Sequence, residues 1–338
     1  MDRFEFHRAK DPADAFRWSE ASRERSGGGS YIAGGTNLVD YMTLDVMRPS
    51  VLIDINDLRH AYGRIERMSD RLRLGALVRM SEAEDDPVIH RDCPVLHQSL
   101  AQAASRQIRN VASLGGNVLQ RTRCEYFRET SWPCNKRNPG SGCAALGGVC
   151  RQHAVLGTSE HCIAAYAGDF GQALIALDAT LETLDGSSGR RRRMPFADLH
   201  RLPGDSPHLE TTLHPGELIT FIEVPMAPWL YRSRYIKIRD RQSYQFALAS
   251  AAVALDMDGE TVREARIALG GVTTVPWRAR EAEAYLRGKA LDEAAAAEAA
   301  RIAFSTARAQ PQNAFKVILG QRTLIRALRE TAQIEIGR

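Results

Sequence analysis

Residues 30–38, SYIAGGTNL, take a short strand directly into a pair of glycines and a polar turn. Helical spacing resumes over 38–46, and residues 51–55, VLIDI, read as a buried strand because β-branched side chains dominate the run. A strand near 4–7 and a helix starting at Pro12 precede this segment. The sequence therefore predicts a small α+β unit over residues 1–58, in which a glycine turn joins a strand to a helix.

A second glycine turn, residues 112–117 with the sequence ASLGGN, repeats the same pattern. Both turns have a small residue, then paired glycines, then a polar side chain. Without a Cβ in the way, the backbone N–H groups of paired glycines can converge on an anion. Each turn alone also fits a plain connection between a strand and a helix. Two such turns in one chain, however, suit a diphosphate held from both sides.

A third glycine-rich segment does not indicate a nucleotide site. Residues 140–145, GSGCAA, match the dinucleotide pattern G-x-G-x-x-A. The preceding segment 133–139, PCNKRNP, cannot form the strand that this motif needs, and no βαβ unit surrounds it. We therefore expect no Rossmann site.

Composition excludes several classes of protein. The chain has 338 residues, 44% of them hydrophobic and 25% charged, which is ordinary for a globular protein with a sizeable core. A net charge of +4 is too small for a dedicated nucleic-acid binder. No run approaches the roughly 18 apolar residues of a membrane span. We therefore expect neither nucleic acid as a partner nor a membrane span.

The N-terminus, MDRFEFHRAK, has acidic residues early and no apolar segment, so it does not resemble a secretory signal. By its own sequence the chain is predicted to be cytoplasmic. Export to the periplasm together with a signal-bearing partner stays an alternative, because such export leaves no mark on this chain.

The cysteines are unusually placed. Five of the six lie in one glycine-rich stretch: Cys124, Cys134, Cys143, Cys150 and Cys162. Their spacing has no tight C-x2-C pair, which zinc ribbons normally show. An iron–sulfur cluster is larger and can take its usual four thiolates from widely spaced loop positions. Residues 120–162 also lack apolar periodicity, so we expect a metal centre rather than a core to order them.

The remaining chain predicts two further units. Residues 59–225 form the second, with the cysteine-rich insertion at about 120–162. Within it we expect helices from Ser81, capped by the Ser81-x-x-Glu84 pattern, over 97–108 and over 169–177, and a strand over 180–184. Residues 226–338 form the third, with strands at 231–238, 247–257 and 263–270, then helices at 278–287, 291–308 and 316–330. Strands followed by helices indicate an α+β domain.

Nearly the whole chain, from Phe4 to about Leu328, resembles the FAD-binding medium subunit of the xanthine dehydrogenase and aldehyde oxidase family of molybdenum hydroxylases. The resemblance rests on residues 33–38 (AGGTNL), 112–117 (ASLGGN), and 216–219 (GELI) through 224–225 (VP). It implies an α+β fold: a two-subdomain FAD-binding domain of the vanillyl-alcohol-oxidase/PCMH type over 1–58 and 59–225. A C-terminal α+β domain over 226–338, an antiparallel sheet with helices, completes that fold.

Within that family, three segments are similar to the flavin subunit of bacterial heterotrimeric aldehyde oxidoreductases with an extra [4Fe–4S] cluster. They are 123–128 (RCEYFR), 133–143 (PCNKRNPGSGC) and 153–157 (HAVLG). The resemblance implies a cluster in the insertion, with the ligands Cys124, Cys134, Cys143 and Cys162. Cys150 is then the spare thiol, and an exchange of Cys150 for Cys162 in the ligand set stays open.

The resemblance also implies where FAD is held: by the two glycine turns, by an acidic residue after the insertion, and by two positions near the flavin ring. These residues are Ala33, Gly34, Gly35, Thr36, Asn37, Leu38, Ser113, Gly115, Gly116, Asn117, Asp169, Ile219 and Lys237. Two plain alternatives stay open. Asp169 could simply cap the helix that follows it, and Lys237 could point to solvent from its strand.

The function implied by the resemblance is electron transfer in an oxidoreductase, with no catalytic residue in this chain. A large subunit would hold the molybdenum cofactor and oxidise an aldehyde, and a small subunit with [2Fe–2S] clusters would relay the electrons. FAD would pass them to an external acceptor. A hydroxylase of purines, N-heterocycles or aromatic acyl-CoA stays an alternative, as does a zinc-binding assembly module.

Overall fold

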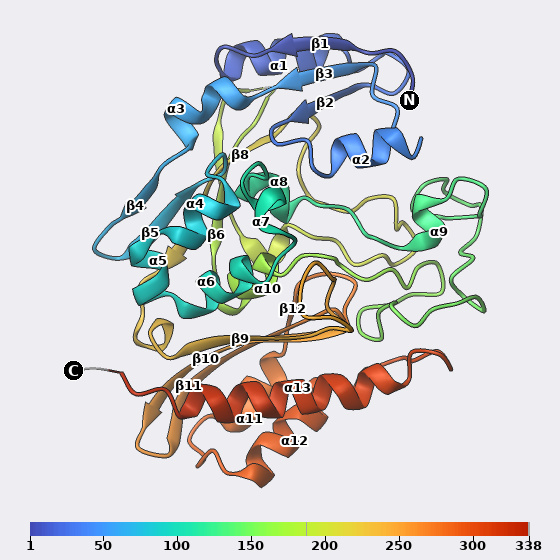
Figure 1. The fold of residues 1–338 in the computed structure, drawn as a ribbon. Coiled ribbons are helices and arrows are strands. Elements are labelled where there is room, and N and C mark those ends of the chain that lie inside the picture. The colour runs from blue at the N-terminus through green and yellow to red at the C-terminus, as the bar shows by residue number, and fades with distance from the viewer. Residues whose placement is uncertain (187, 337–338) are drawn as a thin grey trace.

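The structure, a computed structural model, describes residues 1–186 and 188–336. Its elements form three units, each built on its own sheet. Figure 1 shows the N-terminal unit at the top, the middle unit below it, the C-terminal unit at the bottom, and the insertion at one side.

The N-terminal unit is a parallel sheet in the order β1-β3-β2. Its elements are β1 (Glu5–Arg8), α1 (Pro12–Ala21), β2 (Gly29–Ile32), α2 (Leu38–Thr43), β3 (Val51–Asp54), a 3-10 turn (Asn56–Leu58) and α3 (Arg59–Tyr62). All four residues of β3 are buried, because this apolar strand is central in the sheet. The first glycine turn connects the end of β2 to the start of α2.

The middle unit is an antiparallel sheet in the order β4-β5-β8-β6-β7. Its strands are β4 (Ile65–Arg67), β5 (Arg71–Gly75), β6 (Thr180–Leu184), β7 (Arg191–Pro195) and β8 (Leu218–Pro225). Its helices are α4 (Met80–Asp85), α5 (Pro87–Asp92), α6 (Pro94–Ala101), α7 (Arg106–Arg109), α8 (Leu114–Val118), α10 (Phe170–Ala176) and a 3-10 turn (Phe196–Asp198). Side chains from this sheet and these helices form the largest apolar core.

Two local predictions for this unit are wrong. The helix expected over 97–108 is two helices, because Ala104 adopts a left-handed φ of 45° and Ser105 then caps α7. Ser81 does not cap α4. Arg79 is the residue before that helix, and the Glu82 carboxylate accepts a hydrogen bond from the Arg79 N–H at 2.8 Å.

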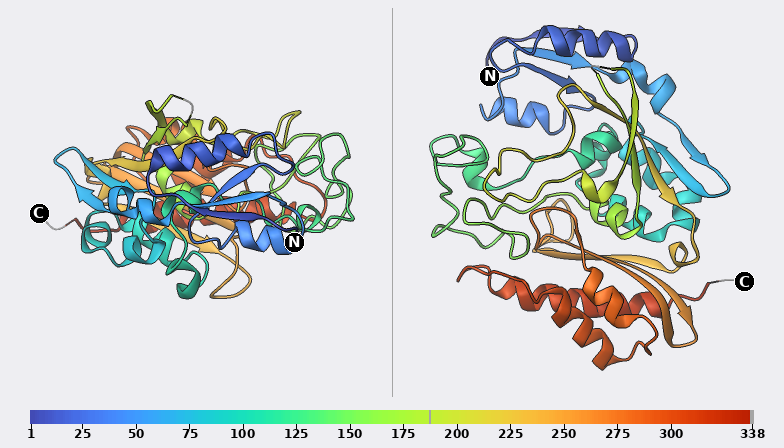
Figure 2. Two further views of the ribbon diagram at one scale, coloured as in Figure 1. Left: turned by 90° about the horizontal axis from the view of Figure 1, so that it is seen from above. Right: turned by 180° about the vertical axis from the view of Figure 1, so that it is seen from behind.

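The C-terminal unit is an antiparallel sheet in the order β12-β11-β10-β9, with three helices packed on one face (Figures 1 and 2). A 3-10 turn (Pro228–Leu230) leads into β9 (Ser233–Ile238), β10 (Ala249–Asp258), β11 (Thr261–Gly270) and β12 (Trp277–Arg278). The helices are α11 (Arg280–Leu286), α12 (Glu293–Ala303) and α13 (Phe315–Ala332).

Alternation along β9 gives this sheet two buried faces. Ile236 belongs to the core shared with α11, α12 and α13, whereas Tyr235 belongs to the core of the middle unit. Lys237 is two residues from Tyr235 and shares its face. The sheet therefore presents the Tyr235 and Lys237 side chains to the middle unit.

The insertion, residues 120–162, has one short helix, α9 (Glu125–Arg128), within otherwise irregular chain. Two isolated antiparallel bridges shape it, Cys134 with Cys143 and Ser159 with Cys162. The first is flanked by a hydrogen bond from Asn135 N–H to the Gly142 carbonyl at 2.7 Å. Figures 1 and 2 show the insertion projecting beside the middle unit, and close to the start of α13.

These observations confirm the predicted α+β class, with an antiparallel sheet and helices in the C-terminal domain. The domain boundaries at 58 and 225 stay predictions. None of the helices within residues 1–186 and 188–336 is long and apolar enough to cross a membrane.

Candidate functional site

The two glycine turns lie against each other. A Cβ added to Gly34 would lie 2.2 Å from the Val111 carbonyl oxygen and 3.1 Å from Ala112 Cα. Only glycine leaves room for such an approach. Because Ala112 directly precedes Ser113, this contact places residues 33–38 beside residues 112–117.

The first turn carries a row of backbone N–H groups that have no protein partner. The N–H groups of residues 34–38 donate to no residue that the structure describes. Gly35 adopts a φ of 70°, and Asn37, just before α2, has helical angles. Successive N–H groups in left- and right-handed conformations form a concave site for an anion. The turn formed by Ala33, Gly34, Gly35, Thr36, Asn37 and Leu38 therefore fits a phosphate.

The second turn differs, because its N–H groups are already used. Gly115 N–H donates to the Ala76 carbonyl at 2.8 Å, and Gly116 N–H donates to Ser113 Oγ at 3.2 Å. The prediction that both glycine pairs offer free N–H groups to an anion is therefore wrong for the second pair. Ser113 instead caps α8, and Gly115 packs closely on Ala76, since a Cβ added to Gly115 would lie 3.0 Å from Ala76 Cβ.

Two asparagines leave buried polar atoms unpaired between the turns. Asn37 Oδ1 accepts a hydrogen bond from Arg121 N–H at 3.0 Å, but no described residue pairs with Asn37 Nδ2. Asn117 Nδ2 lies 3.3 Å from Met80 Sδ, and no described residue pairs with Asn117 Oδ1. Buried polar atoms are nearly always satisfied in folded proteins. One free donor and one free acceptor therefore fit a polar ligand such as FAD.

Asp169 and Lys237 form a buried ion pair. Lys237 Nζ donates to Asp169 Oδ2 at 2.7 Å and to the Gln102 carbonyl at 3.0 Å, and Tyr235 donates to Asp169 Oδ1 at 2.7 Å. The Lys237 and Asp169 side chains are only 1% and 5% exposed. Asp169 makes no capping hydrogen bond to α10. Both plain alternatives are thus wrong, since Asp169 is no cap and Lys237 does not reach solvent.

Ile219 lies where β8 passes between two units. Leu218, before it, belongs to the apolar core of the N-terminal unit, whereas Ile219 packs against the core of the middle unit. Ile219 is half-buried. Its role beside a flavin ring stays a prediction.

Four of the five clustered cysteines border one pocket. They are Cys124, Cys134, Cys143 and Cys162, the four predicted ligands. Cys150 does not border it and instead packs with Ala145 and Ile163 in a small apolar cluster. Cys143 packs against this cluster from the pocket side, so Cys150 lies near the pocket without bordering it.

The thiols around this pocket affect one another electrostatically. Burial, with the nearby Cys134 and Cys162, raises the pKa of the Cys124 thiol to about 12. Burial, opposed by Lys136, raises the pKa of Cys162 to about 11. Without a cation Cys124 and Cys162 stay protonated, whereas iron would bind them as thiolates.

In the described part of the chain, no three His, Cys, Asp or Glu side chains meet closely enough to hold one metal ion. The four cysteines border a pocket rather than meet at a point. The [4Fe–4S] cluster itself stays a prediction.

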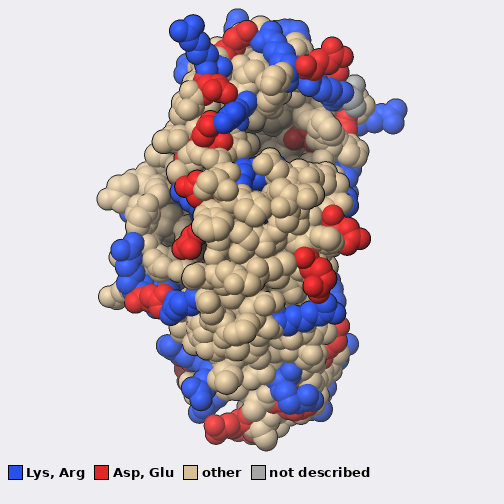
Figure 3. Space-filling model, turned by 90° about the vertical axis from the view of Figure 1, so that its right-hand side faces the viewer, with Lys and Arg blue, Asp and Glu red and all other residues tan. Residues whose placement is uncertain are grey.

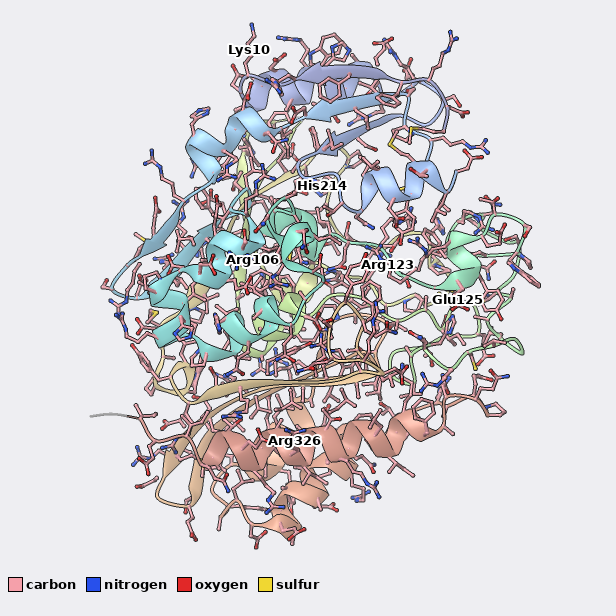
Figure 4. The ribbon with its side chains drawn as sticks, viewed as in Figure 1. Lys10, Arg106, Arg123, Glu125, His214 and Arg326 are labelled. Atoms are coloured by element: carbon pink, nitrogen blue, oxygen red, sulfur yellow. The ribbon has the colours of Figure 1, made fainter. Side chains whose placement is uncertain are left out.

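A second pocket of about 200 Å³ lies between the insertion and the C-terminal unit. Its lining includes Arg123, Glu125, Gly168 and Phe246, and it shares Cys124 with the first pocket. Figure 4 shows Arg123 on the inner side of the insertion and Glu125 at the start of α9. Figure 3 shows that this side of the molecule is mostly uncharged across its middle and is hollowed below the N-terminal unit.

The sequence did not single out two residues of these sites. Tyr235 binds Asp169, and the spacing of Tyr235 and Lys237 on one strand could have indicated that they share a face. His153 Nε2 lies 3.2 Å from Cys124 Sγ. No spacing rule reveals that contact, because it joins distant parts of an irregular loop.

Two protein families match consecutive parts of the chain. Residues 2–227 match the family described as FAD binding domain in molybdopterin dehydrogenase, and residues 234–331 match the CO dehydrogenase flavoprotein C-terminal domain. Solved structures share the fold. The chain matches quinoline 2-oxidoreductase from Pseudomonas putida 86 with a TM-score of 0.74 and 23% identity, covering 98% of each chain.

Two relatives are similar in sequence. The aldehyde oxidoreductase FAD-binding subunit PaoB of Escherichia coli K12 is 44% identical over 332 residues, which cover 98% of either chain. The carbon monoxide dehydrogenase medium chain of Afipia carboxidovorans is 26% identical over 304 residues, 89% of this chain and 85% of that protein. With its free N–H groups, its unpaired asparagine atoms and these matches, the chain belongs to the FAD-binding oxidoreductase subunits of the molybdenum hydroxylase family.

Proposed function

We propose that this chain is the FAD- and [4Fe–4S]-containing electron-transfer subunit of a molybdenum-dependent aldehyde oxidoreductase. In this proposal the chain takes electrons from the [2Fe–2S] clusters of a small subunit, which receive them from a large subunit with the molybdenum cofactor. The chain delivers them to an external acceptor. One observation carries the proposal: the shared pocket of Cys124, Cys134, Cys143 and Cys162 in a chain 44% identical to PaoB.

The first glycine turn would hold the FAD diphosphate, since its N–H groups are free and Gly34 keeps the second turn close. Asn37 and Asn117 would supply one hydrogen bond each through their unpaired atoms. Ser113, Gly115 and Gly116 would shape the other wall rather than donate N–H groups. Bound FAD supplies a carrier that accepts and releases electrons singly or in pairs.

The buried pair of Asp169 and Lys237 would set the charge beside the flavin ring. The pair is neutral overall, and the Gln102 carbonyl and the Tyr235 hydroxyl hold it in place. Because both side chains are nearly excluded from water, a change in either charge is screened less than at the surface and acts more strongly on a neighbouring group.

The proposal is tested by purifying the tagged chain with its partners from its own cells. We expect FAD, broad iron–sulfur absorption, about four irons more than the [2Fe–2S] clusters account for, and reduction by an aldehyde. Zinc in place of iron and flavin would support the assembly module instead. Reduction only by purines, N-heterocycles or aromatic acyl-CoA would move the chain to a related hydroxylase. The compartment of the chain stays a prediction. A twin-arginine signal on a co-purified partner would indicate that the complex is exported to the periplasm.

Replacing Lys237 with methionine should lower the midpoint potential of FAD in the purified complex. The substitution leaves the Asp169 carboxylate buried without its cation, and this negative charge opposes the electrons that reduction adds. A spectroelectrochemical titration measures the change. The double variant Lys237→Met, Asp169→Asn removes both charges and should return the potential toward that of the wild type. An unchanged potential in the single variant contradicts the assignment of Lys237.

A further inference from the structure

We propose that His153 is a positioning residue for the iron–sulfur cluster: its Nε2–H donates a hydrogen bond to Cys124 Sγ and raises the reduction potential of the cluster. This inference rests on the proposed cluster in the insertion. It goes further by assigning a function to a residue that is not a ligand.

The hydrogen bond follows from the surroundings of the two ring nitrogens. His153 Nε2 lies 3.2 Å from Cys124 Sγ, and the residue is 5% exposed. His153 Nδ1 is buried and has no partner among the described residues. A proton on Nδ1 would leave a buried donor unpaired and would turn a nitrogen lone pair toward sulfur. A proton on Nε2 leaves Nδ1 as an unpaired acceptor but turns an N–H toward the sulfur, so the ring donates to the thiolate that a cluster would require.

The backbone of His153 is fixed from the C-terminal unit. Lys316, a fully buried residue of α13, donates from Nζ to the carbonyls of His153 at 2.9 Å, Gln152 at 3.1 Å and Gly271 at 2.7 Å. Asn313 Nδ2 donates to the Ala154 carbonyl at 3.2 Å. These hydrogen bonds hold the peptide groups before and after the His153 Cα. The backbone from which the ring projects is therefore held by Asn313 and α13 as well as by the loop.

A hydrogen bond to a ligating sulfur has a known effect on an iron–sulfur centre. The donor withdraws electron density from the thiolate, which favours the more negative, reduced form and raises the potential. Cys124 also borders the second pocket, whose lining includes Gly168, the residue before Asp169. His153 therefore acts on a thiol that borders both pockets.

His161 offers a matched control: it borders the same pocket and directly precedes Cys162, but no hydrogen bond joins its ring to a described cysteine. Its Nε2 faces Asp205 at 3.4 Å, and its side chain is 46% exposed. Replacing His161 should therefore leave the reduction potential of the cluster unchanged, although it also removes an imidazole from the lining of the pocket.

The experiment compares His153→Leu, His153→Gln and His161→Asn in the purified holo complex. An EPR-monitored redox titration should give a more negative cluster potential for His153→Leu, a smaller shift for His153→Gln, whose amide can still donate, and none for His161→Asn. The FAD potential should stay unchanged in all three. A His153→Leu potential equal to that of the wild type overturns the proposal.

A second measurement keeps the proposal falsifiable if His153→Leu loses its iron. In the wild-type complex labelled with 15N-histidine, pulsed EPR on the reduced cluster should detect coupling to one histidine. His161→Asn should keep this coupling, and its absence from the wild type overturns the proposal. A wild-type chain without iron is a different outcome, since it defeats the proposed function itself and is recognised by metal analysis alone.

Discussion

Replacing Cys134 with serine is expected to remove the iron–sulfur cluster from the chain. The variant should lose about four irons and the broad visible absorption, because a protein thiolate supplies one corner of the cluster and no spare thiol borders the pocket. Its insertion should also become sensitive to protease, since residues 120–162 have little core of their own and one short helix. Iron analysis, an absorption spectrum and limited trypsin digestion measure the three effects.

Cys150→Ser is the matched control for this substitution. Cys150 is buried like Cys134 and lies in the same loop, but it packs with Ala145 and Ile163 and does not border the pocket. We expect Cys150→Ser to keep its iron and its spectrum, and Cys162→Ser to lose both. The reverse result would exchange the roles of Cys150 and Cys162. Full iron in Cys134→Ser would refute the ligand set.

Replacing Gly34 with alanine is expected to weaken FAD binding by about tenfold to a hundredfold, the equivalent of the roughly 1–3 kcal/mol that overpacking costs. The added Cβ would lie 2.2 Å from the Val111 carbonyl oxygen, so the two glycine turns must move apart. Backbone surrounds this position, and no flexible side chain can give way. The FAD content of the purified chain and the FAD affinity of the deflavinated chain measure the loss.

Gly259→Ala is the control for the Gly34 substitution. Gly259 lies in the turn between β10 and β11, and nothing lies within 4 Å of the added Cβ. Its φ of 57° costs an alanine about 1–2 kcal/mol of stability, but the turn is remote from both glycine turns. The control should be less stable and keep its FAD. Equal FAD loss in both variants would mean that instability, not the contact at Gly34, releases the flavin.

Local pattern predicted most of the fold. The β-branched run of β3 is a strong signal, and β3, β9, β10 and β11 appear where expected within a few residues. The helix expected over 97–108 failed because its apolar spacing continues across Ala104, where the backbone turns left-handed. A single non-glycine residue in that conformation leaves no mark in a sequence. β8 was not expected either, since its pairing with β5 and β6 joins distant segments.

The candidate sites show where prediction from sequence stops. Paired glycines located both turns, but only the structure shows that the N–H groups of the second are spent on Ala76 and Ser113. Spacing located the cysteine cluster and could not separate Cys150 from Cys162. That separation depends on how an irregular loop folds, and neither periodicity nor propensity encodes it. The pairing of Asp169 with Lys237 likewise depends on how β9 docks onto the middle unit.

The hydrogen bonds from α13 to the insertion determine when the insertion can fold during synthesis. Lys316 follows His153 by 163 residues, so the ribosome exposes all five clustered thiols well before it makes the helix that fixes them. Domains generally fold from the N-terminus as they emerge. The insertion can therefore reach its final shape only in a finished chain, and a chain truncated before α13 would present its thiols in a loose loop.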